Sequence, residues 1–396
     1  MSGVFQKGVL SDIAHVTMGQ SPKKEFVSPE EQGLPLLNGP TEFGSSHPTP
    51  VQWATSFSKT AEPGDILFCV RGSAGRMNWA DRKYAIGRGI ASISAINPQE
   101  RHFVRGAINL ALPELLAAAT GSTFPNVSRL QLSELPVAIP PVVVRTEISR
   151  LLGALDDKIE SNRRQRTLCR QLGLALVTRL EYTATEYCPL EDFALSISRG
   201  IAPKYYKDED VEPVMVLNQR CIREGWVSPN AARLMLPRMK AKDAGIAERG
   251  DLLVNSTGQG TLGRVGRWSY EDSLYVDSHV TVVKPDRTQI APTLLSYLVL
   301  PRQPEIEEMA EGSTGQTELS PNRLGSLNLP VIPQVEQELI EPKLLALEEE
   351  AHVAAVETAK LEALRDALLP ELMSGRIRVP EARDAIDEEV GDVEIQ

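Results

Sequence analysis

The sequence predicts an α+β fold: two similar mixed α/β domains in a pseudo-two-fold tandem repeat, separated by two long antiparallel coiled-coil helices. The first observation behind this prediction is an internal repeat. The second is a long segment with helical periodicity after each copy of the repeat, and the third is a texture of short strand-like runs within each copy. At 396 residues the chain is long enough for about two domains of ordinary size.

Short motifs recur in the same order in both halves of the chain. The run LSDIA at residues 10–14 returns as LEDFA at 190–194, and GDIL at 64–67 returns as GDLL at 250–253. The separation between matched motifs grows slowly along the chain, as expected when loops gain residues and the framework stays fixed. Two copies are too few for a solenoid, so we expect two globular domains related by an approximate two-fold axis.

A segment with helical periodicity follows each copy. Residues 142–183 contain no proline and repeat apolar residues every three or four positions. The second segment alternates steps of four and three, which is the pattern of a coiled-coil seam. An isolated helix of this kind is unstable in water, so we expect the two helices to pack on each other, antiparallel, with one domain at each end. The alternative is that each helix packs only on its own domain.

The predicted seam is formed by eight residues. They are the apolar residues at the three-to-four spacing: Ile148, Leu152, Leu155, Ile159, Ile340, Leu344, Leu347 and Leu361. The resulting boundaries are 1–140 for the first domain, 141–185 for the first helix, 186–332 for the second domain, 333–377 for the second helix and 378–396 for an acidic tail. Residues 381–396 carry seven acidic side chains and one basic one, which is typical of a disordered segment.

The net charge of −11 bears on the partners that the chain can bind. The acidic tail supplies more than half of this charge, but the remaining part of the chain is still not basic. Binding to nucleic acid requires Lys and Arg near the phosphates. We therefore expect this chain alone to bind DNA weakly, with a more basic partner supplying much of the backbone contact.

Several protein classes are disfavoured by what the sequence lacks. There is no uninterrupted apolar run of about 18 residues and no basic segment followed by an apolar one at the amino terminus, so we expect a cytoplasmic protein without a membrane span. The four cysteines have no C-x-x-C spacing, which disfavours zinc and disulfide frameworks and favours reduced thiols. They are Cys69, Cys169, Cys188 and Cys221.

The search for catalytic motifs yields two weak matches. Gly258-x-Gly260-x-x-Gly263 matches the dinucleotide fingerprint, but the residues after it do not begin a helix, so a loop joining two strands is the preferred interpretation. Asp277-Ser278-His279 contains triad residue types, but neighbours on a strand point to opposite faces. No phosphate-binding P-loop and no methyltransferase segment is found. We therefore predict no catalytic, cofactor or metal site.

The order of the motifs at the end of each copy resembles a known family. The second copy has S-x-x-x-L-x-x-L at 320–327, P-x-x-x-Q-x-x-I at 333–340 and LLPELMSGRI at 368–377, and the first copy has counterparts at 128–135 and 141–148. This order is similar to that in the specificity subunits of type I restriction-modification systems, which act in phage defence. One residue departs from the family pattern, because the first copy has Arg145 where Gln is usual.

The resemblance implies a non-catalytic DNA-binding subunit. Each domain would be a target-recognition domain that reads one half of a bipartite target in double-stranded DNA. The helix pair would set the unread spacer and, through the seam residues named above, dock two methyltransferase subunits. Restriction and motor subunits would join through the complex. S-adenosylmethionine, ATP and magnesium would be held only by those partner subunits. The alternatives are a scaffold that holds two protein partners at a fixed separation, and the DNA reader of a related defence system.

Candidate DNA-contact residues lie in turns and loops at matching places of the two copies. Arg, Lys, Asn, Gln, Ser and Thr side chains are those that reach base edges and phosphates. The matching loops differ in these side chains, as two different half-targets would require. The candidates are Lys23, Lys24, Arg71, Ser73, Arg76, Lys204, Tyr205, Asn255, Ser256, Thr257, Gln259, Thr261, Arg264, Gln316 and Thr317.

Overall fold

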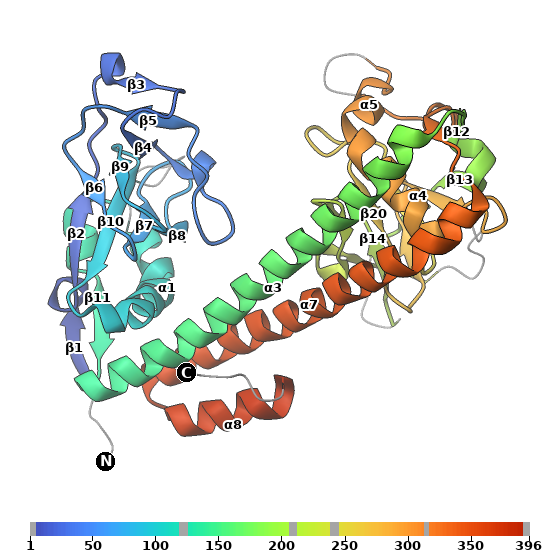
Figure 1. Ribbon diagram of the computed structural model, residues 1–396. Coiled ribbons are helices and arrows are strands. Elements are labelled where there is room, and N and C mark those ends of the chain that lie inside the picture. The colour runs from blue at the N-terminus through green and yellow to red at the C-terminus, as the bar shows by residue number, and fades with distance from the viewer. Residues whose placement is uncertain (1–4, 119–125, 206–211, 238–244, 313–316, 391–396) are drawn as a thin grey trace. The chain divides into compact units, whose positions relative to one another are not determined.

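The computed structural model describes residues 5–118, 126–205, 212–237, 245–312 and 317–390. It forms two compact units. Unit 1 contains residues 1–163 and 356–396, and unit 2 contains residues 164–355. Each unit therefore holds one copy of the repeat together with part of each long helix (Figure 1).

Unit 1 is built on two larger sheets and a two-stranded ribbon. The four-stranded antiparallel sheet has the order β2 (Ala14–Met18), β10 (Ile90–Ala95), β7 (Ile66–Cys69), β8 (Met77–Trp79). The five-stranded sheet has the order β3 (Val27–Ser28), β5 (Gln52–Ala54), β4 (Leu34–Leu37), β9 (Tyr84–Ile86), β6 (Thr60–Ala61). The ribbon pairs β1 (Gln6–Val9) with β11 (Pro136–Ile139), and the helices are α1 (Arg101–Ala117) and the short α2 (Arg129–Ser133).

Unit 2 repeats this plan, except that its main sheet has an additional hairpin and its second sheet has no counterpart of β3. Its main sheet has the order β13 (Ala194–Arg199), β22 (Val280–Pro285), β19 (Leu252–Asn255), β20 (Val265–Arg267), β16 (Trp226–Val227), β15 (Ile222–Arg223). The second sheet has the order β17 (Arg233–Met235), β14 (Val214–Leu217), β21 (Leu274–Val276), β18 (Ile246–Ala247), and the ribbon pairs β12 (Tyr187–Pro189) with β23 (Asn328–Pro330). The helices are α4 (Pro292–Val299), α5 (Gln303–Glu308) and α6 (Pro321–Gly325). The predicted repeat is confirmed, and the hairpin β15–β16 is the addition.

The Gly-Asp motif has the same structural role in both units. Gly64 and Gly250 adopt positive φ angles of 89° and 102°, which glycine accepts without steric cost. The aspartate that follows accepts a hydrogen bond from a backbone N–H three residues earlier, at 2.9 Å for both Asp65 and Asp251. Asp65 is then bound by serines of β10, and Asp251 by Lys284 of β22. The motif thus fastens the turn before β7 and β19 to the neighbouring strand.

The long helices are α3 (Val142–Thr183) and α7 (Gln334–Ser374). In unit 1, Asn162 of α3 donates a hydrogen bond to Glu357 of α7 at 2.8 Å. In unit 2, Gln165 donates to Glu350 at 2.7 Å. Within unit 1, Asp156, which precedes Asn162 in α3, contacts Arg365, which follows Glu357 in α7. Within unit 2, Arg170 follows Gln165 and contacts Glu348, which precedes Glu350. The helix segments therefore run antiparallel in each unit, as predicted.

The predicted seam is buried at seven of its eight positions. The buried residues are Ile148, Leu152, Leu155, Ile159, Ile340, Leu344 and Leu361, each at most 7% exposed. Leu347 is only half-buried, and its neighbour Glu348 is 2% exposed instead. The prediction is wrong at Leu347 because a hydrogen-bonded carboxylate takes the inward position. The seam residues also pack against domain residues such as Phe103 and Leu294, so the helices contact both each other and their domains.

The acidic tail is not wholly disordered, which corrects the prediction. Residues Val379–Val390 form helix α8 in unit 1 (Figure 1). Ala382 and Ile386 are fully buried beside Leu372 and Met373 of α7. The apolar residues at a three-to-four spacing were hidden among acidic ones, and the burial of that face stabilises the helix. Residues 391–396 lie outside the described residues.

Arg145, the residue that departs from the family pattern, makes the same kind of contact as its counterpart Gln337. Gln337 Nε2 donates to the carbonyl of Ile332 at 2.9 Å, and its amide oxygen accepts from the backbone just before α4. Arg145 Nη1 donates to the carbonyl of Pro140 at 2.9 Å, and its Nε lies 2.6 Å from Glu100 Oε2 just before α1. An ion pair in unit 1 thus replaces an amide contact in unit 2.

Replacing Arg145 tests how far unit 1 depends on this ion pair. Glu100 is 2% exposed, so Arg145→Ala leaves a buried carboxylate without its cation. We expect the free energy of unfolding of unit 1 to fall by about 3–5 kcal/mol, measured by urea denaturation. The control is Arg150→Ala, an exposed arginine of α3, with an expected change within about 0.5 kcal/mol. Equal effects of the two variants would show that the Arg145–Glu100 contact is not stabilising.

Candidate nucleic-acid interface

In unit 1 the glycine-rich loop joins β7 to β8. Gly72 and Gly75 have positive φ angles of 78° and 94°, which lets the chain reverse within a few residues. The Arg76 guanidinium donates to the carbonyls of Pro40 and Phe43 at 3.0 and 3.1 Å, so Arg76 fixes the base of the loop. Arg71 and Ser73 are exposed at the tip, where they are available to a ligand.

In unit 2 the corresponding loop joins β19 to β20, as predicted. Two predicted contact residues at its start, Asn255 and Ser256, have no exposed surface. The Asn255 amide donates to the carbonyls of Gln219 and Thr261, each at 3.0 Å, and the Ser256 hydroxyl is hydrogen-bonded to Thr281. The prediction that Asn255 and Ser256 contact DNA is therefore wrong for this conformation, because these polar groups hold the loop from inside.

The tip of the unit 2 loop presents a different set of side chains. Gln259 is exposed between Gly258 and Gly260, both at positive φ. Thr257 Oγ1 lies 2.8 Å from His279 Nδ1, and Thr261 Oγ1 donates to the carbonyl of Thr257 at 3.3 Å. These contacts leave Gln259 as the side chain of the loop that is best placed to reach a ligand.

Arg264 ends the unit 2 loop and supports it from below. Its Nη2 donates to the Gly260 carbonyl at 2.9 Å, and its side chain is half-buried. Part of its hydrogen-bonding capacity is thus used within the loop, as that of Arg76 is in unit 1.

A second segment lies beside each loop and completes a composite surface. In unit 2, Thr257 forms an isolated β-bridge with Glu318, and the Leu319 N–H donates to the Ser256 carbonyl at 2.8 Å. The exposed Thr317 therefore belongs to the same surface as Gln259. Gln316, the other candidate in this segment, lies outside the described residues.

The same arrangement occurs in unit 1. The Val127 N–H donates to the Val70 carbonyl at 3.0 Å, and Arg71 Nε donates to Asn126 Oδ1 at 3.0 Å. The segment that precedes the domain exit is thus anchored to the glycine loop in both copies. The frame is shared, whereas the exposed tips differ in chemistry.

The early turns lie against other sheets. Lys23 and Lys24 are exposed just before β3 of the five-stranded sheet. Lys204 is exposed, and the half-exposed Tyr205 forms an isolated bridge with Met235 at the end of β17. From the sequence, these turns and the glycine loops were predicted together as candidates for DNA contact. In the structure, the turns lie beside the second sheet of each unit, whereas the glycine loops join strands of the main sheet.

Several basic residues of unit 2 that could contact DNA were not predicted from the sequence. The Arg233 guanidinium lies 5.0 Å from the centre of the Tyr205 ring. A cavity of about 380 Å³ beside hairpin β15–β16 is lined by Arg220, Arg223 and Trp226. Guanidinium groups are suited to phosphate contacts. The hairpin has no counterpart in the first copy, so the repeat gave no signal for these residues.

The Asp277-Ser278-His279 segment forms a tight turn between β21 and β22 rather than a strand. Asp277 Oδ1 accepts the backbone N–H of His279 at 2.9 Å, and burial raises the pKa of Asp277. This carboxylate therefore caps its own turn and does not orient the His279 ring. Within the described ranges, no group of three or more His, Cys, Asp and Glu residues is arranged to hold a metal ion.

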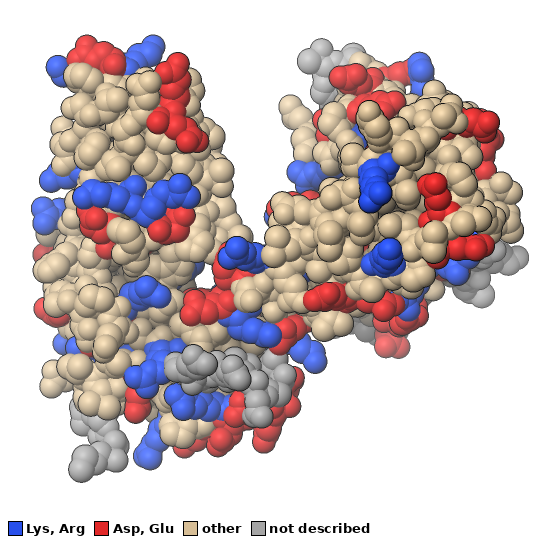
Figure 2. Space-filling view, viewed as in Figure 1, with Lys and Arg blue, Asp and Glu red and all other residues tan. Residues whose placement is uncertain are grey.

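The four cysteines are free, and burial raises the pKa of each thiol. Raised pKa values disfavour the reactive thiolate form. Among the described helices, none is long and apolar enough to cross a membrane. On the face shown in Figure 2, basic and acidic side chains are interspersed over an otherwise uncharged surface.

The fold and the loops define a class of protein with a duplicated α/β domain whose matched loops carry different polar tips. Residues 4–168 match the family model described as the type I restriction modification DNA specificity domain. The chain is also 32% identical over 152 residues to the type I restriction enzyme MjaX specificity subunit of Methanocaldococcus jannaschii, a match that spans 38% of this chain and 36% of that protein.

At the level of the fold, similarity extends over most of the chain. The crystal structure of the type I restriction-modification system S subunit from M. genitalium matches with a TM-score of 0.62 and 18% identity, covering 94% of this chain and 96% of that one. The resemblance seen in the sequence is thus confirmed. Residues 4–168 are thus similar to the DNA specificity domain of type I restriction-modification systems, and the chain shares the fold of an S subunit from such a system.

Proposed function

We propose that this chain is the DNA specificity subunit of a type I restriction-modification complex, in which the domain of each unit reads one half of a bipartite target. The observation that carries this proposal is the pair of matched composite surfaces. Their frames agree down to single backbone hydrogen bonds, whereas the tips present Arg71 and Ser73 in one unit and Gln259 and Thr317 in the other. Base edges are discriminated by such side chains.

The long helices are proposed to dock two methyltransferase subunits and to set the spacer. Besides the buried seam, they expose apolar side chains: Leu168 and Leu172 of α3 are each 53% exposed, and Leu339 and Val353 of α7 are 67% and 65% exposed. Leu168 and Leu172 stand about one helical turn apart, and neighbouring exposed apolar side chains are typical of a surface that a partner covers. A basic partner would also supply the phosphate contacts that the acidic chain lacks, and restriction and motor subunits would join through it.

We propose that this chain is a non-catalytic subunit. The glycine-rich fingerprint at Gly258 joins two antiparallel strands, so it lacks the helix amino terminus that binds a dinucleotide phosphate. In this proposal S-adenosylmethionine, ATP and magnesium are bound by the partner subunits, and the complex acts on DNA in the cytoplasm.

Reconstitution with a cognate methyltransferase subunit tests the proposed function. Methylated bases would be mapped after incubation with genomic DNA and S-adenosylmethionine. We expect one bipartite motif with a spacer of fixed length, because two separate surfaces read the DNA. A continuous motif, or methylation independent of sequence, would contradict the proposal and favour a scaffold that binds only proteins.

Replacing one exposed residue of each loop by alanine tests whether each surface reads its own half-site. We expect Arg71→Ala to relax the sequence preference in one half of the motif and Gln259→Ala in the other half, each with a loss of about 1–3 kcal/mol of discrimination at the affected base. The measurement is methylation of a target library with randomised half-sites. Each variant is the control for the other, since its unaltered half should keep its preference. Loss of preference in both halves, or in neither, would contradict this assignment.

A further inference from the structure

Each unit places one carboxylate at the same point of its long helix. Asp156 of α3 and Glu348 of α7 each stand eight residues after the matched isoleucines Ile148 and Ile340. Glu348 is 2% exposed, and the Asp156 side chain is 23% exposed. Neither is used by the proposed DNA-contact surfaces, so their placement needs another explanation.

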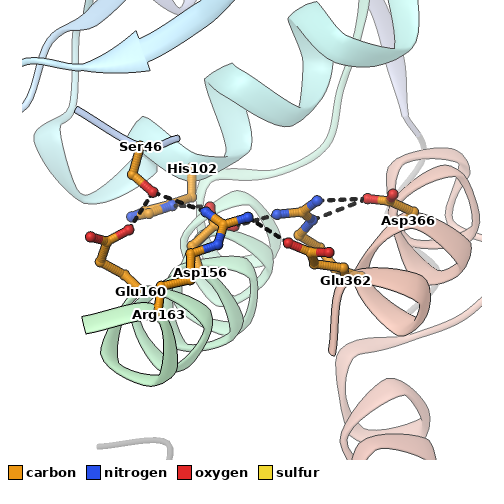
Figure 3. A network of polar contacts seen from close by, with 8 residues as sticks. Ser46, His102, Asp156, Glu160, Arg163, Glu362 and Asp366 are labelled. Atoms are coloured by element: carbon orange, nitrogen blue, oxygen red, sulfur yellow. Dashed lines mark hydrogen bonds and ion pairs between the residues drawn. The ribbon is translucent and has the colours of Figure 1, made fainter. Parts of the chain in front are cut away.

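In unit 1, Asp156 joins three elements (Figure 3). His102 of α1 contacts its Oδ2 through Nδ1 at 3.3 Å, and Arg365 of α7 contacts its Oδ1 at 3.0 Å. Arg101 Nε donates to His102 Nε2 at 3.2 Å, which leaves Nδ1 as the nitrogen that donates to Asp156. The Trp79 ring lies 4.8 Å from the His102 ring, centre to centre, and holds its position. Asp156 is therefore the meeting point of the domain and both long helices.

The electrostatics favour the ionised form of Asp156. Burial acts to raise its pKa, but the His102 hydrogen bond and the nearby Arg105 and Arg365 guanidinium groups lower the pKa below its ordinary value. The carboxylate thus stays charged near neutral pH and holds its two hydrogen-bond partners in fixed directions.

In unit 2, Glu348 joins the equivalent three elements. Tyr297 of α4 donates its hydroxyl to Glu348 Oε1 at 2.8 Å, and Arg170 of α3 lies 3.9 Å from the same oxygen. The Trp226 ring lies 3.8 Å from the Arg170 guanidinium and fixes it against the added hairpin. Burial and the charge of Glu348 raise the pKa of Tyr297, so the hydroxyl remains protonated and donates. The side chains differ from those of unit 1, but the three-way junction is the same.

Two glycines inside α3 make room for these junctions. A Cβ atom on Gly153 would lie 3.1 Å from His102 Cδ2, and one on Gly173 would lie 2.3 Å from Tyr297 Cε1. Glycine inside a helix weakens it relative to alanine. Both glycines of α3 stand where a side chain of the domain packs against this helix. At Gly153 that side chain is His102, which contacts Asp156, and at Gly173 it is Tyr297, which contacts Glu348.

Stability alone does not explain polar junctions at these points. A buried ion pair is often no more stabilising than apolar residues of similar size, whereas its directional hydrogen bonds can fix one arrangement among several. The surrounding clusters already supply apolar contacts between domain and helices. The hydrogen bonds of the polar groups are directional, so they restrict how the domain can be oriented on the helices. A domain that must present a loop at a set angle requires such a restriction.

We propose that Asp156 and Glu348 are positioning residues, each of which fixes the orientation of one recognition domain on the helix pair and so restricts the spacer length that the complex accepts. This inference rests on the proposed function, since a spacer exists only for a bipartite reader. The residues act through His102 and Tyr297 and touch no DNA themselves.

The test uses the reconstituted complex and a target library in which the spacer is lengthened or shortened by one base pair. We expect Asp156→Ala and Glu348→Ala to raise methylation at altered spacers, relative to the native spacer, by about tenfold, with both half-site preferences unchanged. Glu348→Gln, which keeps an acceptor for Tyr297, should restore much of the strict spacing. The controls are exposed acidic residues of the same helices, Asp157→Ala in α3 and Glu338→Ala in α7, which should keep the native spacing.

A second variant covers the case in which a carboxylate variant does not fold. Gly173→Ala leaves Glu348 intact but places a methyl group where the Tyr297 ring lies, so it should also relax the spacing. A lower melting temperature with strict spacing retained in all variants would overturn the inference, as would altered half-site preferences. If the unmodified complex shows no bipartite motif, the proposed function itself fails, and the two failures are thereby distinguished.

Discussion

The apolar seam shared by the two long helices and their domain is the interaction on which each unit depends. In unit 1, Leu155 of α3 and Leu361 of α7 are fully buried in one cluster with Phe103 of α1 and Ile93 of the sheet. Neither helix could remain folded in water with this face exposed. The helices are therefore part of the domain core, and they are not independent rods to which a finished domain is attached.

Polar contacts at the border of this seam fix the orientation of each domain on the helices. The apolar cluster tolerates small rotations, because apolar contacts are not directional. Asp156 and Glu348, each held by one group from the domain and one from the opposite helix, permit fewer arrangements. The same logic applies to Arg145 and Gln337, which bind the helix start to the turn that precedes it. Directional contacts at both places favour one orientation of the domain on its helices.

Much of this architecture follows from patterns that the sequence repeats. The GDIL and GDLL motifs and the heptad spacing predicted the two domains and the helix pair, because backbone periodicity and glycine geometry act locally. Burial of single polar residues was not predictable in this way. Asn255 and Glu348 are inside because their partners, Gln219 and Tyr297, come from distant parts of the chain. Helix α8 was missed because its acidic composition outweighed its few apolar positions.

The central claim is that domain and helices form one cooperative core in each unit, and native-state hydrogen exchange of the full chain tests it most directly. Backbone amides of residues 151–159 in α3 and 361–368 in α7 should open with the same free energy as those of β7 and β10, within about 1 kcal/mol. Global unfolding would then be the only route to exchange for all of them. Exchange of the helices at a free energy several kcal/mol below that of the strands would contradict the claim.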